Sequence, residues 1–346
     1  MSKNAPIHSI TILTTNTCTA ACAHCCMNSG PKRRGKLDAD SIISTLAGLV
    51  EHGSLNTVVF AGGEPTLLKE DLLTAISAAS DMGLNTRIVT NASWATTPEK
   101  AREKLSQLRA AGLRELNISA DDYHLPFIAF DRVKTLWFAA KEFDFSSVLI
   151  ANCAGPNSVI TPEWIKNELG EDLPTRFDDD GNSQISDTVE GKTFYGLSNA
   201  NIQRVRYGFE EDVQSWEVGD ADLNRPCPYA GRSISMSPDG HLLACCGFEF
   251  DADSPLRFGS VEEQPVDEII SAAYDGVILN AIASIGPFGV MKVVQSVAPE
   301  VPFRDDYNSI CEICFDVTQR PDARKALMRA TPILARFFID QQVAAE

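Results

Sequence analysis

The sequence predicts an α/β protein in which a parallel sheet is covered by helices. Three observations lead to this fold class. Over the first 157 residues, five strand-like segments alternate with four amphipathic helical segments, the connections are short, and glycines close most of the helical segments. Repeated βα units of this kind form a parallel sheet that is either barrel-like or doubly wound.

The predicted elements follow one another in regular order. Segments rich in β-branched residues predict strands at 9–15, 56–65, 85–93, 113–122 and 146–155. Apolar residues at helical spacing predict helices at 38–53, 69–83, 97–112 and 130–143. The third of these helices has the clearest start, because Thr97 can cap it and Pro98 suits its first turn.

The pattern weakens after residue 157. The segment 172–192 is acidic and rich in turn residues, so we expect a loop there, and 201–212 is a possible sixth strand. The segment 232–246 then predicts a β-hairpin that turns at 238–240. Helices are expected at 266–284 and, as one or two segments around Pro332, at 321–346.

Composition limits the possible partners and the compartment. The formal net charge is -17, which disfavours nucleic acid and anionic membranes as partners. The residues before Cys18 contain no secretory signal, and no stretch approaches the roughly 20 apolar residues of a membrane span. We therefore expect a cytoplasmic protein, where clustered cysteines more often bind metal or do redox chemistry than form disulfides.

Four of the ten cysteines fall within nine positions, in the stretch CTAACAHCC. Cys18, Cys22 and Cys25 have the spacing C-x3-C-x2-C, directly after the first predicted strand. Three thiolates on one loop can hold three irons of a four-iron, four-sulfur (4Fe-4S) cluster and leave the fourth iron open. The alternative is structural zinc, which favours C-x2-C pairs, and that two-residue spacing occurs only once in this loop.

This loop resembles the signature of radical S-adenosylmethionine (SAM) enzymes. In that family SAM binds the open iron, and its reductive cleavage gives a 5′-deoxyadenosyl radical that takes a hydrogen atom from the substrate. The resemblance covers roughly residues 9–210 and implies a partial (β/α)6 TIM-like barrel with a C-terminal β-hairpin-plus-helix extension. It also implies that His24, between the second and third cysteines, lies beside the adenine.

The stretch GGEP at 62–65 strengthens the resemblance. It follows the second predicted strand, at the end of the strand where barrels bind their ligands. The resemblance implies that Gly62, Gly63 and Glu64 line the methionine end of SAM, and that Pro65 makes the turn rigid. Taken alone, the stretch would be an ordinary βα turn.

Later strands offer further SAM contacts. Ser119 and Asp121 lie on one face of the fourth predicted strand, and the resemblance implies that they contact the ribose. The glycine usual after this aspartate is replaced by Asp122, so the turn differs. Asn91 and Asn152 match positions of polar contacts in the family, although both could equally cap strand ends.

The remaining cysteines suggest a second site. Cys227, Cys245, Cys311 and Cys314 resemble the C-terminal auxiliary-cluster extension of SPASM and twitch enzymes. No cysteine follows Cys314, so the resemblance is to the twitch form with one fully ligated 4Fe-4S cluster. A four-cysteine zinc site is the alternative, and Cys246 could replace Cys245 as a ligand. The domains implied are 1–215, 216–320 and 321–346.

Candidate catalytic residues are less well defined. Asp122, Tyr123 and His124 follow the fourth predicted strand, where they could bind substrate or move protons, or form a polar loop around a buried tyrosine. Cys26 and Cys153 are expected to be small buried residues.

The expected activity is an oxidative modification, because a fully ligated auxiliary cluster can accept an electron from a product radical. A ribosomally made peptide is the favoured substrate, and a small metabolite such as an amino-sugar is the alternative. The first strand begins almost at once, so we expect no N-terminal leader-binding domain. An electron donor such as a flavodoxin or ferredoxin is implied. A zinc-binding scaffold or redox sensor is the non-enzymatic alternative.

Overall fold

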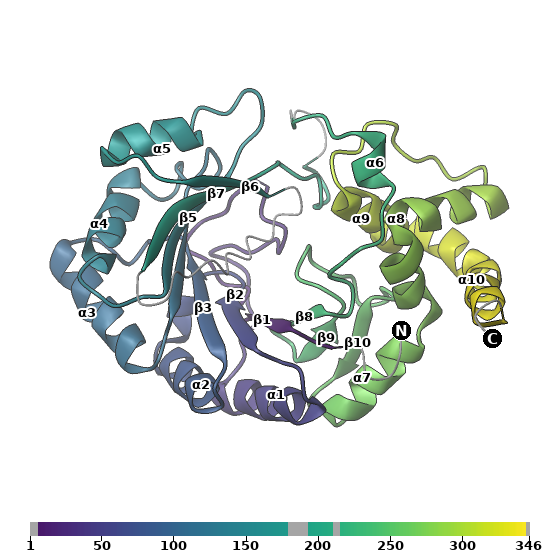
Figure 1. Ribbon diagram of the computed structural model, residues 1–346, viewed down its shortest axis with the longest axis horizontal. Helices are drawn as coiled ribbons and strands as arrows, with labels where there is room; N and C mark the ends of the chain where they lie inside the picture. Colours follow the sequence, from purple (N-terminus) through teal and green to yellow (C-terminus); the bar gives the residue numbers. More distant parts are fainter. Residues whose placement is uncertain (1–5, 179–192, 210–214, 344–346) are drawn as a thin grey trace.

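The computed structural model describes residues 6–178, 193–209 and 215–343, with the side chains of 178 and 337–343 left aside. A curved sheet of ten strands forms its centre, in the order β10-β9-β8-β1-β2-β3-β4-β5-β7-β6. Figure 1 shows the strands as an arc, with helices α1 to α4 along its outer side. The two ends of the sheet do not pair with each other, so the barrel is open.

The first half of the chain supplies the parallel part of the sheet. Its strands are β1 (Ser9–Leu13), β2 (Thr57–Ala61), β3 (Asn85–Thr90), β4 (Glu115–Ser119), β5 (Ser147–Cys153), β6 (Thr175–Asp178) and β7 (Phe194–Ala200). The connecting helices are α1 (Ala39–His52), the short 3-10 helix η1 (Pro65–Leu68), α2 (Glu70–Asp81), α3 (Pro98–Ala110), α4 (Phe130–Ala140) and α5 (Pro162–Leu169). The predicted α/β class with a parallel, barrel-like sheet is confirmed.

Helix α1 shows how local sequence sets these elements. The Asp38 side chain accepts a hydrogen bond from Ser41 N at 2.7 Å, which caps the first turn. Gly53 ends the helix with φ of 105°, a conformation that L side chains rarely adopt. Between these ends, Ile42 and Leu46 are fully buried against the sheet side.

Two predictions for the middle of the chain were wrong. The sixth strand of the barrel is β7, not 201–212, because 194–200 pairs in parallel with β5. Residues 201–209 form no strand, and 210–212 lie outside the described residues. The expected loop at 172–192 contains strand β6, which pairs in parallel with β7, and its remainder from 179 lies outside the described residues.

The C-terminal segment continues the same sheet. Its elements are α6 (Asp220–Leu223), β8 (Ser233–Met236), β9 (His241–Leu243), β10 (Arg257–Ser260), α7 (Val266–Asp275), α8 (Val277–Val297), α9 (Ile310–Gln319) and α10 (Pro321–Val343). The predicted hairpin is confirmed, since β8 pairs antiparallel with β9. Strand β8 also pairs in parallel with β1, so no break in the sheet separates the two halves of the chain.

The helices near the end also differ from expectation. The segment predicted as one helix at 266–284 is divided at Gly276. Helix α8 is itself interrupted at Gly286, with φ of 74° and ψ of 167°, followed by Pro287. At the end of the chain, α10 is one helix that continues through Pro332.

Helix α8 is the one described helix whose length and apolar composition would allow it to cross a membrane. The expectation that no stretch meets this criterion was therefore wrong. Its most apolar window is 56% buried inside the protein. One such helix is weak support for a membrane span, because core helices satisfy the same criterion.

Candidate functional site

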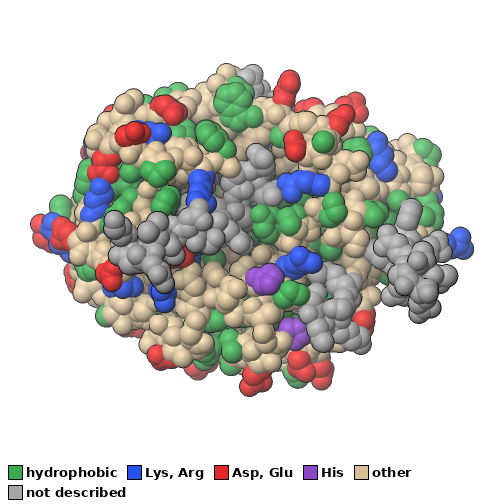
Figure 2. Space-filling model, viewed as in Figure 1, with side chains coloured by type: hydrophobic (Ala, Val, Ile, Leu, Met, Phe, Trp, Pro, Cys, Tyr) green, Lys and Arg blue, Asp and Glu red, His purple; other side chains and the backbone are tan. Residues whose placement is uncertain are grey.

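The open barrel encloses a cavity of about 780 Å³. The predicted cluster ligands Cys18, Cys22 and Cys25 line it, on the loop that follows β1. On the face shown in Figure 2, acidic side chains lie mainly around the rim, basic side chains lie both at the rim and near the centre, and histidines lie near the centre and below it. The cavity volume falls within the range of roughly 300–1,000 Å³ that is usual for small-ligand sites.

Nitrogen donors surround the sulfurs of this loop. Ala20 N donates to Cys18 Sγ at 3.5 Å, and Ser29 N donates to Cys25 Sγ at 3.4 Å. Asn91 Nδ2 also donates to Cys18 Sγ, at 3.4 Å. Burial raises the pKa of the Cys18 thiol to about 11, so this group needs a metal to become a thiolate near neutral pH. Such donors fit metal-bound sulfur, because hydrogen bonds to cluster sulfurs are a normal part of iron–sulfur sites.

The glycine turn after β2 packs directly against the cysteine loop. Gly63 N donates to Thr15 O at 2.6 Å, and the backbone N of residue 64 donates to Thr17 O at 3.0 Å. A Cβ on Gly63 would lie 2.1 Å from Thr17 O, and one on Gly62 would lie 2.9 Å from Thr14 N. These positions therefore need glycine because of the protein's own backbone, before any ligand is considered.

Glu64 and Pro65 are buried within the turn after β2. The Glu64 side chain is not among those that line the cavity. Its carboxylate accepts hydrogen bonds from Thr66 Oγ1 at 2.6 Å, Thr90 Oγ1 at 2.8 Å and Asn91 N at 3.0 Å. Through these hydrogen bonds Glu64 fixes the turn to the end of β3. Pro65 is buried at the start of η1.

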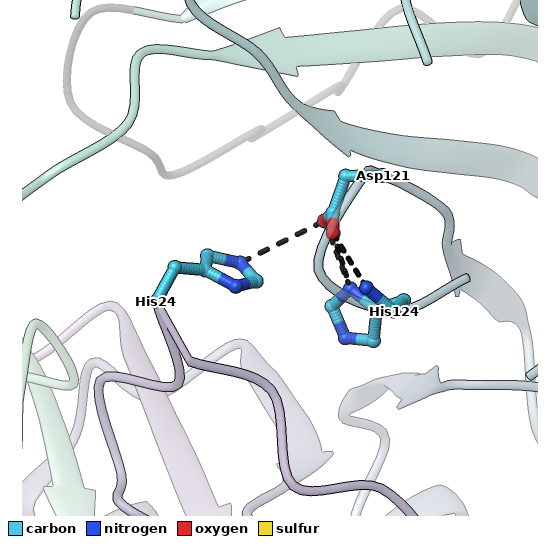
Figure 3. Close-up of side chains that lie close together, drawn as sticks. All are labelled: His24, Asp121 and His124. Carbon is cyan, nitrogen blue, oxygen red and sulfur yellow. Dashed lines mark hydrogen bonds and ion pairs between the residues drawn. The ribbon is translucent and has the colours of Figure 1, made fainter. Parts of the chain in front are cut away.

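Three side chains converge beside the cysteine loop: His24 from that loop, and Asp121 and His124 from the segment after β4 (Figure 3). His124 Nδ1 lies 2.8 Å from Asp121 Oδ2, and His24 Nε2 lies 3.6 Å from the same oxygen. The rings of His24 and Tyr123 are stacked with centroids 4.6 Å apart. The arrangement fixes the His24 ring at the edge of the cavity.

The two histidines carry different charges. Burial lowers the pKa of His24 to about 4, so its ring is neutral at pH 7. Burial also opposes charge on His124, but the Asp121 carboxylate outweighs this and raises the pKa of His124 well above its ordinary value. For Asp121, burial raises the pKa, yet the nearby histidines outweigh it and the resulting pKa is about 2. A neutral imidazole ring suits stacking against a flat aromatic group.

Of the other predicted site residues, Ser119 and Asn152 line the cavity, whereas Asp122 and Tyr123 do not. The Asp122 carboxylate accepts hydrogen bonds from Val159 N and Ile160 N, both at 2.9 Å. Asp122 therefore holds the loop before α5. Tyr123 supports His24 through the ring contact already described.

Several buried polar atoms that line the cavity have no hydrogen-bond partner among the described residues. Three of them lie on the loop after β1 or near the carboxyl end of β5, the end of the cavity called its mouth below: His24 Nδ1, Ser29 Oγ and Asn152 Oδ1. Asn152 is 3% exposed, and its Nδ2 already donates to Ala120 O and Ile160 O. A bound molecule with polar groups would provide hydrogen-bond partners for these atoms. SAM has polar groups of this kind and a size that suits the cavity.

The second cysteine set comes together from three elements. Cys245 follows β9, and Cys311 and Cys314 lie in the first two turns of α9. A Cβ on Gly247 would lie 3.6 Å from Cys245 Sγ and 3.8 Å from Cys311 Sγ. Burial raises the pKa of Cys245 well above its ordinary value, and the neighbouring Cys246, Cys314 and Cys227 raise it further. All four predicted ligands are thus neighbours.

One group of possible metal-ligand atoms lies close together in the described part of the chain: His24, Asp121 and His124, within 4.8 Å of one another. Structural zinc therefore stays the alternative to iron–sulfur clusters at the two cysteine sites.

The sequence did not reveal two features of the site. Cys26 and Cys153, which were expected to be small buried residues, also line the cavity, as does Cys246. The positions of Cys26, directly after Cys25, and of Cys153, at the end of β5, gave no signal that could separate them from packing residues.

The second missed feature is a buried ion pair. Glu312, between Cys311 and Cys314, is fully buried and pairs with Arg204 at 3.0 Å. Glu312 Oε1 also accepts a hydrogen bond from Arg204 N at 2.6 Å. The pair ties the segment after β7 to the helix that carries two cysteines.

The fold and the three-cysteine loop define a radical SAM domain. Residues 12–127 match the family model described as the radical SAM superfamily, so this part of the chain is a radical SAM domain. The match includes the cysteine loop, the GGEP turn and the segment that carries Asp121 and His124.

Two curated relatives come from bacteria. The chain is 20% identical over 302 residues to the putative peptide biosynthesis protein YydG of Bacillus subtilis (strain 168), covering 86% of this chain and 88% of that protein. It is 41% identical over 106 residues to PqqA peptide cyclase of Bradyrhizobium diazoefficiens, covering 30% of this chain and 26% of that protein.

Two solved structures share the fold. Native anSMEcpe with bound AdoMet and a Cp18Cys peptide matches with a TM-score of 0.54 and 13% identity, over 96% of this chain and 99% of that chain. Streptococcus suis SuiB bound to S-adenosylmethionine matches with a TM-score of 0.51 and 16% identity, over 77% of this chain and 65% of that chain. At these identities the likeness establishes the fold alone.

Proposed function

We propose that this chain is a radical SAM enzyme that carries two 4Fe-4S clusters and modifies a ribosomally made peptide by oxidation. The observation that carries the proposal is a three-cysteine loop with nitrogen donors at its sulfurs, facing a cavity whose mouth has unpartnered buried polar atoms. When bound, the first cluster and SAM supply a 5′-deoxyadenosyl radical that removes a hydrogen atom from the substrate.

The chain's own residues hold and orient these groups. Cys18, Cys22 and Cys25 bind the first cluster, and the turn at Gly62 and Gly63 keeps their loop in position. SAM lies at the mouth of the cavity, with its adenine against the neutral His24 ring. Polar groups of SAM form hydrogen bonds with the unpartnered atoms at the mouth. Ser119, Asn152 and the Asp121–His124 pair lie next to the ribose. Asn91 donates its hydrogen bond to Cys18 and so holds this cysteine in place.

In the same proposal, Cys227, Cys245, Cys311 and Cys314 bind an auxiliary cluster of the twitch type. Four thiolates would leave no open iron, so a cluster held there would supply electron exchange and would not bind substrate. It would take up the electron that an oxidation releases, and a flavodoxin or ferredoxin would reduce the first cluster. We place the protein in the cytoplasm, with domains at 1–215, 216–320 and 321–346.

The printed names of the relatives support a peptide substrate. YydG is described as a putative peptide biosynthesis protein, PqqA peptide cyclase acts on a peptide, and anSMEcpe was solved with a bound peptide. The amino-sugar alternative has no comparable support, because none of the four relatives described above is named for a sugar substrate.

The test uses anaerobically purified, reconstituted protein. We expect about eight irons per chain, the content of two 4Fe-4S clusters. With a strong reductant and SAM, the protein should release 5′-deoxyadenosine, and replacing Cys18, Cys22 and Cys25 together by Ala should abolish this release and halve the iron. Unchanged iron in the triple variant would reject the first cluster.

The oxidative step has its own test. Co-expressed candidate peptides should lose two hydrogen atoms, read by mass spectrometry. One outcome would reject oxidation and keep the radical SAM assignment. In it 5′-deoxyadenosine forms and the peptide changes, for example in stereochemistry, but its mass stays the same.

A further inference from the structure

The lumen of the barrel carries polar side chains below the level of the SAM site. Along β3 and β4, alternate residues face the cavity, among them Arg87, Glu115 and Asn117. Arg87 and Glu115 are neighbours in the strand register and form an ion pair with a 2.5 Å contact. Asn85 Nδ2 donates to the second oxygen of Glu115, so this carboxylate is fully used.

Among the polar side chains of β3 and β4 that face the cavity, Asn117 differs from its neighbours in its hydrogen bonding. Its side chain is 4% exposed and lines the cavity, yet its Oδ1 has no hydrogen-bond partner among the described residues. The other unpartnered atoms that line the cavity belong to the mouth. Asn117 lies two residues before Ser119 on β4, which is about 7 Å deeper along the strand. A ligand group that satisfies Asn117 therefore lies beyond the region proposed for SAM.

The charges around the cavity narrow the kind of group that binds there. Among the described lining residues, Glu115 and Asp121 supply the carboxylates. Glu115 is paired with Arg87, and Asp121 is paired with His124. An ammonium group, such as that of an amino-sugar, would thus find no free carboxylate in the lumen, and burying it unpaired would be costly. An uncharged polar group fits the lumen better.

We propose that Asn117 is a specificity-determining residue that binds a backbone amide of the substrate. A carboxamide offers one acceptor and two donors side by side. A residue in extended conformation presents its own N–H and C=O toward the same side, as in a strand pair. Asn117 can therefore pair with both groups of one extended substrate residue. This inference rests on the proposed function and narrows its substrate class to peptides.

The experiment compares two buried asparagines on the cluster-loaded protein with SAM. Asn117→Leu removes the carboxamide in the cavity. Asn199→Leu is the matched control, because Asn199 on β7 is 5% exposed and also has an unpartnered Oδ1, but does not line the cavity. A pool of capped octapeptides and a pool of amino-sugars are tested for acceleration of 5′-deoxyadenosine release, and the most active peptide is taken forward.

We expect peptides, not amino-sugars, to accelerate the release. Asn117→Leu should bind the active peptide about tenfold more weakly, since two hydrogen bonds are lost, and Asn199→Leu should bind it as the wild type does. Peptides with single amides replaced by esters give a second readout. One ester should bind the wild type severalfold more weakly than the parent peptide does, but should bind Asn117→Leu almost as well as the parent peptide does. Such non-additivity between the ester and the Asn117 substitution indicates a direct contact between the two groups.

Thermal unfolding of the metal-free variants gives a readout that does not depend on activity. Both leucine variants should melt at or above the wild-type temperature, because each removes an unpartnered buried polar group. Peptide binding that is unaffected by Asn117→Leu and by every ester would overturn the inference and leave the proposed function intact. Acceleration by amino-sugars alone would overturn the peptide assignment itself, and the absence of any 5′-deoxyadenosine would reject the radical SAM activity.

Discussion

At the scale of single residues, Gly63 packs the glycine turn after β2 against the loop that carries the first three cysteines. A methyl group there would collide with Thr17 O at 2.1 Å, so Gly63→Ala should displace the loop that carries Cys18. We expect this variant to lose SAM binding and also roughly half of its iron, as measured by colorimetric iron assay. Gly30→Ala is the control, because its Cβ would have no neighbour closer than 3.9 Å. Full iron content in Gly63→Ala would mean that the loop tolerates the collision.

The adjacent cysteines after β9 offer a second test at this scale. Cys245 Sγ lies beside Cys311 Sγ across Gly247, whereas Cys246 lines the cavity. Cys245→Ser should therefore lose about half of the iron, and Cys246→Ser should retain about eight irons per chain. The reverse pattern would make Cys246 the ligand.

At the scale of elements, the Glu312–Arg204 pair attaches α9 to the segment after β7. Glu312→Gln would leave a buried guanidinium with less compensation, and breaking a buried pair costs about 3–5 kcal/mol. We expect a lower melting temperature and loss of iron from the auxiliary site, with the first cluster retained. Glu300→Gln removes a surface partner of Arg329 and should change neither quantity. Equal effects of the two variants would contradict the proposed role of Glu312.

The cap of α1 gives a pH-dependent prediction. Hydrogen bonds from Ser41 hold the pKa of Asp38 below its ordinary value. The stabilisation is therefore present above the ordinary aspartate pKa and is lost as the pH falls through the lowered value. Asp38→Ala should cost about 1 kcal/mol at pH 7, a melting shift of about 1–2 °C.

The cap prediction is checked by calorimetry across pH. The difference between wild type and Asp38→Ala should close toward strongly acidic pH, while Asp38→Asn, which can still cap, should stay close to the wild type at pH 7. A difference between wild type and Asp38→Ala that does not depend on pH would contradict the assignment.

Local signals account for what could be predicted from the sequence. The caps at Asp38 and Thr97 and the β-branched strands act through neighbouring residues, so the first four βα units and the fifth strand were recognisable. Strand β6 and the division at Gly276 depend on pairing and packing with distant segments, which local composition does not report. The same holds for Glu312, whose partner Arg204 lies 108 positions away.

The candidate site was predictable to a similar degree. Cysteine spacing located the three-cysteine loop, because its ligands are close together in the chain. The actual environments of Glu64 and Asp122 were not predictable, since backbone donors from other segments occupy their carboxylates. Asn117 gave no signal either, because an unpartnered carboxamide is recognisable only once the barrel is assembled.

At the scale of the whole molecule, the pairing of β1 with β8 has a consequence for biosynthesis. Ser9 Oγ donates to Ser233 Oγ across 224 positions of the chain. A ribosome that adds about 5–20 residues per second needs roughly 10–45 s to make this interval. Throughout that time the nascent chain presents one edge of β1 without its final neighbour, next to the thiols of the first loop. Strand β8, in the last third of the polypeptide, thus covers an edge of β1 that was made much earlier. Termination of synthesis before β8 would leave this edge unpaired and prone to aggregation.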